Sequence, residues 1–313
     1  MNTPTKVVGF LAALAVVFGL ALGAGSSFGP VETAAAAYKA HDGETGDPNE
    51  EASDAGADMP GGLMTTQDGY SLTLTTSETE PGRNIPVAFT IDGPDARPVT
   101  AYDVAHDQRL HLIAVRRDFT GYQHVHPELS PRGVWSTTLD LTAGQWRLFA
   151  DFTPAGAGPL TLGADLAVPG DYQPAVPAAS RTSHIDGYRV TLDGDLTDGG
   201  DARLTLSVAR DGEPVTDLQP YLGAYGHLVA LREGDLAYLH VHPDGAPGDG
   251  TTRPGPDVVF HAAVPSAGTY HLYLDFKHQG VVRTAAFTVG TTGARAPAAD
   301  QSVTGTDDGH SAH

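Results

Sequence analysis

The chain has 313 residues, a formal net charge of −20 and no cysteine. This length suits about two ordinary domains, and so negative a charge disfavours nucleic acid or an anionic membrane surface as a partner. The absence of cysteine excludes disulfides, thiolate zinc sites, iron–sulfur clusters and blue-copper centres with a cysteine ligand. Any metal site must therefore use nitrogen and oxygen ligands.

The first 30 residues are typical of an export signal or a membrane anchor. A single basic residue, Lys6, precedes an uncharged stretch that begins at Val7 and meets no acid until Glu32. Its apolar part is near the roughly 18 residues that span a bilayer, and its small residues also suit signal cleavage, so both alternatives stay open. In either case we expect the body of the protein outside the cytoplasm, anchored to the membrane or secreted.

Residues 31–62 are predicted to form an acidic, disordered linker. Between His41 and Pro60 there are seven acidic and no basic side chains among small residues and prolines. Such a composition cannot bury enough apolar surface to fold.

From residue 63 onward the pattern changes to short alternating segments rich in β-branched and aromatic residues, separated by Gly, Pro, Asp and Asn. This pattern is typical of a β-sandwich or small barrel. We expect an all-β protein with two tandem antiparallel β-sandwich domains, 63–170 and 184–290, joined by a linker, 171–183, and followed by a disordered tail, 291–313. The clearest expected strands are Tyr70–Thr75, Ile85–Thr90, Trp146–Phe152, Arg203–Val208 and Thr269–Phe276.

A seventeen-residue string supports two copies of one domain. It occurs at His111–Pro127 and again at His227–Pro243, with nine identical positions and with histidine at its first, fourteenth and sixteenth positions. A second string, Thr142–Phe152, matches Ser266–Phe276 at five of eleven positions. Because histidine is the commonest metal ligand among side chains, the repeated histidines are the main functional clue.

Hairpin register indicates how the histidines converge. A two-residue turn at Gly234-Asp235 would place His227 opposite His242, with His240 on the same face. The first copy has the same spacing and predicts His126 opposite His111, although its turn residues suit a primed turn poorly and a longer loop through Gly121 is an alternative.

Two aspartates end the matching strand in each repeat, on the opposite parity from its core side chains. Such a carboxylate completes a three-histidine site or orients an imidazole. The predicted metal ligands are His111, His124, His126, Asp151, His227, His240, His242 and Asp275. We expect Cu(II) first, since imidazole sites bind it most tightly among the divalent ions, and Zn(II) second.

The sequence allows two other interpretations. The same face of the second hairpin carries Val229, Leu231, Leu236 and Tyr238, so the histidines could be structural residues at the edge of a core in an adhesion or scaffold protein. No nucleophile elbow, phosphate-binding loop or zinc-protease motif is found, so we expect no enzyme. His106, His271 and His278 occur in one repeat only and are treated as accessory.

The strings HLIAVRRDFTGYQHVHP, YLGAYGHLVALREGDLAYLHVHP and TYHLYLDFKHQG resemble a group of exported or membrane-anchored actinobacterial proteins with tandem Ig-like or cupredoxin-like β-domains, associated with heavy metals and with copper. The resemblance covers both repeats and is closer in the second. It implies an extracytoplasmic protein that buffers or delivers copper.

Overall fold

The computed structural model describes residues 60–175, 177–239 and 241–292, which fall within one compact unit, Ala57–His313. The described residues form strands, turns and loops. In this part of the chain no helix is long and apolar enough to cross a membrane. The predicted signal or anchor, nearly all of the acidic linker and the tail from residue 293 lie outside the described residues.

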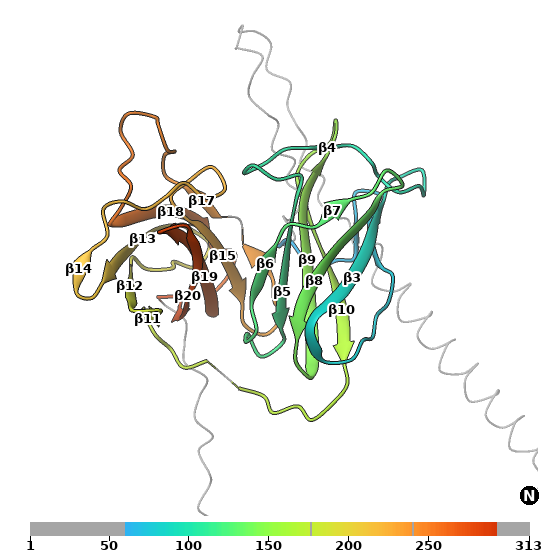
Figure 1. Cartoon of the computed structure of the whole chain (residues 1–313), viewed down its shortest axis with the longest axis horizontal. Helices are drawn as coiled ribbons and strands as arrows, with labels where there is room; N and C mark the ends of the chain where they lie inside the picture. Colours follow the sequence, from blue (N-terminus) through green and yellow to red (C-terminus); the bar gives the residue numbers. More distant parts are fainter. Residues whose placement is uncertain (1–59, 176, 240, 293–313) are drawn as a thin grey trace, which may run out of the picture. The chain divides into compact units, whose positions relative to one another are not determined.

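The first repeat is a sandwich of two antiparallel sheets (Figure 1). One sheet has the order β1-β2-β3-β8-β7, formed by β1 (Thr66–Gln67), β2 (Tyr70–Leu74), β3 (Gly82–Asp92), β8 (Val134–Leu141) and β7 (Glu128–Leu129). The other has the order β10-β9-β5-β6, formed by β10 (Leu160–Val168), β9 (Gly144–Pro154), β5 (Leu110–Arg116) and β6 (Gln123–Val125), and β4 (Tyr102–Asp103) pairs with β9.

The second repeat has the same architecture. Its first sheet has the order β11-β12-β13-β18-β17, formed by β11 (Thr182–Ile185), β12 (Tyr188–Asp193), β13 (Asp201–Arg210), β18 (Asp257–Ala263) and β17 (Val241–Pro243), with β14 (Glu213–Pro214) beside β13. Its second sheet has the order β16-β15-β19-β20, formed by β16 (Tyr238–Leu239), β15 (His227–Arg232), β19 (Thr269–His278) and β20 (Val281–Gly290). Two tandem antiparallel β-sandwiches were predicted, and the structure confirms this fold class and the five clearest strands.

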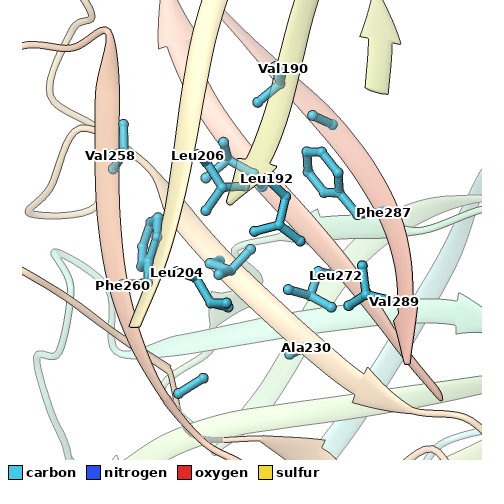
Figure 2. Packing of buried hydrophobic residues seen from close by; sticks show 14 of the residues in the cluster. Val190, Leu192, Leu204, Leu206, Ala230, Val258, Phe260, Leu272, Phe287 and Val289 are labelled. Carbon is cyan, nitrogen blue, oxygen red and sulfur yellow. The ribbon is translucent and has the colours of Figure 1, made fainter. Parts of the chain in front are cut away.

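Each sandwich has its own core, which follows from the alternation of side chains along the strands. In the first, Phe89 and Trp135 of one sheet share a cluster with Trp146 and Leu148 of the other. In the second, Leu204 and Phe260 meet Leu272 and Phe287, as Figure 2 shows.

A third apolar cluster joins the two sandwiches, and we call it the interdomain cluster. The cluster forms because strand β5 is apolar on both faces. Its even-numbered residues Leu112 and Ala114 pack in the first core. Ile113 and Val115 lie on the opposite face and are buried in the interdomain cluster. The cluster consists of Ile113, Val115, Phe119 and Phe149 from the first repeat with Val229, Leu231, Leu236, Tyr238 and Tyr273 from the second. A large apolar side chain that is fully buried contributes about 1.5 to 3 kcal/mol, so this contact holds the repeats together firmly.

The segment just before β1 adds hydrogen bonds to both repeats. Gly62 N donates to Thr161 O of β10 (2.7 Å), while Tyr238 N of β16 donates to Gly61 O (2.9 Å). The guanidinium of Arg147 also donates to the carbonyl oxygens of Gly62 (2.6 Å) and Leu63 (2.9 Å). Residues 60–62, which the sequence assigned to the linker, therefore contact both sandwiches.

Candidate metal centre

Three histidines of the first repeat converge on the face of β5 that looks toward the second repeat. Strand β6 pairs with β5 so that His124 lies opposite Ile113, and the same register, continued by two residues, places His126 across from His111. The predicted register of this hairpin is confirmed. Its connection is the longer loop, from Arg117 to Tyr122, in which Gly121 has a φ of +69°.

The ring nitrogens of these three residues, which we call the histidine triad, are close enough to share one ion. Nδ1 of His111 is 3.0 Å from Nε2 of His124 and 3.2 Å from Nε2 of His126. All three ligating atoms lie within 4.8 Å of one another. Two nitrogens that each bind a metal at about 2.0 to 2.1 Å are about 2.9 to 3.6 Å apart for angles of about 90 to 120°. The two distances from His111 fall in this range.

The partners on the far side of two rings determine which nitrogens carry hydrogen. Nε2 of His111 lies 3.1 Å from the carbonyl oxygen of Ala105, which only accepts, so this nitrogen donates. Nδ1 of His124 lies 2.8 Å from Oδ2 of Asp275 and donates to the carboxylate in the same way. In their neutral forms, His111 and His124 thus direct two lone pairs at each other across 3.0 Å.

Two facing lone pairs repel and cannot hydrogen-bond, so the arrangement calls for a cation between them. A metal ion satisfies both at once, and a proton on His124 is the alternative. Burial, with His124 adding to it, lowers the pKa of His111 to about 3, and burial lowers the pKa of His126 to about 4. Both rings are therefore neutral near pH 7 and have lone pairs to offer a metal.

The carboxylate that orients His124 comes from the second repeat. Asp275 of β19 is fixed on its other oxygen by the hydroxyl of Thr284, which donates to Oδ1 at 2.5 Å. The side chains of His124 and Asp275 are both only 2% exposed. A carboxylate behind a ligating histidine is a recurrent feature of metal sites, because it fixes the tautomer and the orientation of the ring. The centre is therefore built from both repeats.

His227 also reaches the triad from the second repeat. Its ring lies nearly parallel to that of His111, at an interplanar angle of 10° and a centroid distance of 5.4 Å, and its centroid is 4.8 Å from that of His124. Burial lowers the pKa of His227 well below its ordinary value.

The second hairpin departs from the predicted arrangement beyond its first residue pairs. Ala230 lies opposite Leu239 as the register requires, but Arg232 N donates to Ala237 O, so the loop is longer than the two-residue turn at Gly234-Asp235. The prediction that His227 lies opposite His242 is wrong. Strand β16 ends at Leu239, and β17 joins the other sheet, where His242 lies opposite His261.

The remaining predicted ligands occupy different places. His242 is exposed, and Asp151, which lies opposite His111 in the β5–β9 ladder, accepts a hydrogen bond from the Thr161 hydroxyl (3.1 Å). His227 lies opposite Asp275. His240 lies outside the described residues. Among the described residues, therefore, one three-histidine group forms rather than two.

The sequence did not reveal three other parts of the centre. His106, which was treated as accessory, places its ring centroid 6.0 Å from that of His111 and 5.7 Å from that of His227. The Ala105 carbonyl carries no sequence signal. Tyr122 stacks on Tyr273 at 4.0 Å, and its buried hydroxyl has no hydrogen-bond partner among the described residues. The available clue was that Tyr122 is one of the nine identical positions of the repeated string.

Comparison with known proteins identifies both repeats with one domain. The model of a family described as "Domain of unknown function (DUF8832)" matches residues 65–163 and 183–293. A search of curated proteins finds no significant match.

Solved structures are similar to this chain only at low identity. The Escherichia coli adhesin FdeC is 14% identical with a TM-score of 0.24, covering 73% of this chain and 65% of its own. The Yersinia pseudotuberculosis adhesin InvE is 13% identical with a TM-score of 0.21, covering 70% and 58%, and the tandem Ig repeats of Dlar are 9% identical with a TM-score of 0.19, covering 71% and 97%. This chain thus spans less than two thirds of either adhesin, and likenesses of this size carry no inference about function.

Proposed function

The chain belongs to the DUF8832 family through both of its repeats, and from the centre that the two repeats build together we propose that it binds a divalent transition metal. The three ligands are His111, His124 and His126. The function is binding, with buffering or delivery of the ion, rather than catalysis.

The observation that carries the proposal is the opposed pair of lone pairs on His111 and His124. Hydrogen bonds to Ala105 O and to Asp275 fix the tautomers of His111 and His124. Neither ring then has a hydrogen on the nitrogen that faces the other ring at 3.0 Å, so a cation is needed to make this contact attractive. Burying an unsatisfied polar group costs about 1 to 3 kcal/mol, and a metal between the two rings removes this cost.

Cu(II) is the ion that these ligands favour, with Zn(II) second. The centre offers imidazole nitrogens and no sulfur, and imidazole sites follow the order in which Cu(II) binds most tightly among the divalent ions. The chain has only three methionines, Met1, Met59 and Met64, which argues against a thioether site for Cu(I). The resemblance to copper-associated exported proteins agrees with this choice.

We place the protein outside the cytoplasm, held at the membrane or secreted. The support is the apolar segment that follows Lys6, which is typical of an export signal or a membrane anchor.

The experiment is metal retention by the full chain, kept in detergent if it remains with the membrane. After incubation with Cu(II) or Zn(II) and desalting, the chain is expected to retain one tightly bound ion, which His124→Ala abolishes. His184→Ala is the matched control, because His184 is an exposed histidine on β11 outside the centre. Retention of only trace metal by the wild type, or equal retention by His124→Ala, would contradict the proposal.

The second candidate is a scaffold in which the histidines are structural. The hydrogen bond from His124 to Asp275 joins residues 151 positions apart and ties the two repeats together without any metal. With a proton on His124, the contact to His111 becomes an ordinary hydrogen bond. In that case His124→Ala lowers the free energy of unfolding, and neither protein retains metal.

A further inference from the structure

A cavity of about 140 Å³ lies beside the triad and is open to solvent. At about 30 Å³ per molecule in the liquid, this volume holds four or five waters, which is room for a partly hydrated ion. Four histidines from three separate segments line it: His106, His111, His227 and His242. His111 is thus shared between the cavity and the triad.

His106 is presented to this cavity by a tight turn. The backbones of Ala105 and Gln108 exchange hydrogen bonds of 2.9 and 3.0 Å, and His106 and Asp107 between them have φ values of +48° and +63°. Positive φ at two successive non-glycine residues is uncommon and disfavoured, and it persists where the surrounding structure holds it. The same turn holds His111 through the Ala105 carbonyl, so one loop sets the positions of both rings.

The ring spacings form a continuous series from solvent to the triad. Two imidazoles that bind one ion place their ring centroids about 4.5 to 6.4 Å apart, since each centroid is about 3.2 Å from the metal. His106 is 5.7 Å from His227, and His227 is 4.8 Å from His124. His106 is exposed, whereas the side chain of His124 is 2% exposed.

We propose that the cavity is a loading site, in which His106 and His227 bind a divalent transition-metal ion from solution and transfer it to the triad. The ion exchanges water for imidazole at His106, then gains His227, and finally His111, His124 and His126. No bond other than metal–ligand bonds forms or breaks, and no electron is transferred. This inference rests on the proposed function of the triad.

The test measures the rate at which the full chain takes up Cu(II), followed by quenching of tryptophan fluorescence in a stopped-flow instrument. The variant is His106→Asn, because asparagine tolerates positive φ and retains the turn while the imidazole is lost. We expect uptake severalfold slower than in the wild type, with the same amount of tightly bound Cu(II) at equilibrium. His184→Asn, which removes an exposed imidazole elsewhere, should load at the wild-type rate.

Two results separate this inference from the proposed function. If the wild type retains one tight Cu(II) but His106→Asn loads equally fast, the loading site is refuted and the triad stands. If the wild type retains no tight Cu(II), the proposed function fails and the loading site fails with it. Slower loading that is shared by His184→Asn would reflect overall charge or histidine content and would also overturn the inference.

Discussion

Replacing Asp275 with asparagine tests whether the second repeat tunes a metal centre whose ligands lie in the first. Asp275 accepts the Nδ1 hydrogen of His124 at 2.8 Å and is held by Thr284, and both the carboxylate and the imidazole are 2% exposed. Asparagine has nearly the same shape but no charge, so the ring loses the partner that makes its other nitrogen a stronger donor to a metal. Loss of such an outer partner typically lowers metal affinity about 10- to 100-fold, or about 1.4 to 2.7 kcal/mol.

The assay is competition for Cu(II) between the full chain and a chelator of known affinity at fixed pH. Asp257→Asn is the matched control, because Asp257 also accepts a hydroxyl hydrogen, from Ser207, but is itself exposed at the start of β18 in the second repeat. The control should leave the affinity unchanged. If Asp275→Asn binds Cu(II) as tightly as the wild type while folding normally, then Asp275 does not orient a metal ligand, and the interdomain account of the site is refuted.

Three further predictions concern stability and its pH dependence. In the metal-free chain the pKa values of His111 and His126 are held at about 3 and 4, against 6.5 when unfolded, so the unfolded state binds more protons between pH 6.5 and 4. The free energy of unfolding, measured in urea, should fall as pH is lowered through that range, by at most about 1.4 kcal/mol per pH unit for each ring. In His111→Gln the unfolding free energy should change less steeply with pH. An equally steep pH dependence in the variant and the wild type would show that His111 is not its cause. Tyr273→Phe removes the hydroxyl that donates to Phe119 O across the repeats at 2.7 Å. Because the carbonyl loses this donor, the free energy of unfolding measured in urea should fall by about 1 to 3 kcal/mol. An unchanged free energy would show that this hydrogen bond between the repeats contributes little to stability. Gly62→Ala forces a Cβ into the ring of Phe149 at a residue with φ of +74°, so the thermal midpoint of unfolding should fall. Gly156→Ala is the control for backbone strain alone, because Gly156 also has positive φ but faces open space. Equal midpoints for the two variants would refute the steric argument.

The strand period was enough to predict the two sandwiches and the convergence of the first three histidines. The parity of β9 also predicted correctly that Asp151 and its counterpart Asp275 point away from the core side chains such as Trp146. These are local consequences of alternation and of hairpin register, which depend on residues close in sequence.

The partner of the histidine-bearing face could not be predicted in the same way. Alternation shows that Ile113 and Val115 share a face with His111, but not that this face meets Val229 and Leu231 of the other repeat. The partnership of His124 with Asp275, 151 residues away, is likewise a consequence of how two folded domains dock.

The second hairpin shows a different limit. Its register is correct at Ala230 and Leu239, yet the chain changes sheets before His242, which then pairs with His261. A pairing rule extended along a strand fails where the strand crosses between the two layers of a sandwich. The two strings, although their histidines are equally spaced, therefore place their last histidines in different surroundings.

The most direct test of the central claim is pulsed electron paramagnetic resonance of the full chain loaded with one equivalent of Cu(II). This measurement detects the remote nitrogens of imidazoles bound to copper and counts them. The account predicts three imidazoles in the wild type and fewer in His126→Ala, with no change in His184→Ala. A spectrum with one imidazole, or one that His126→Ala leaves unaltered, would show that the ion does not bind at the triad.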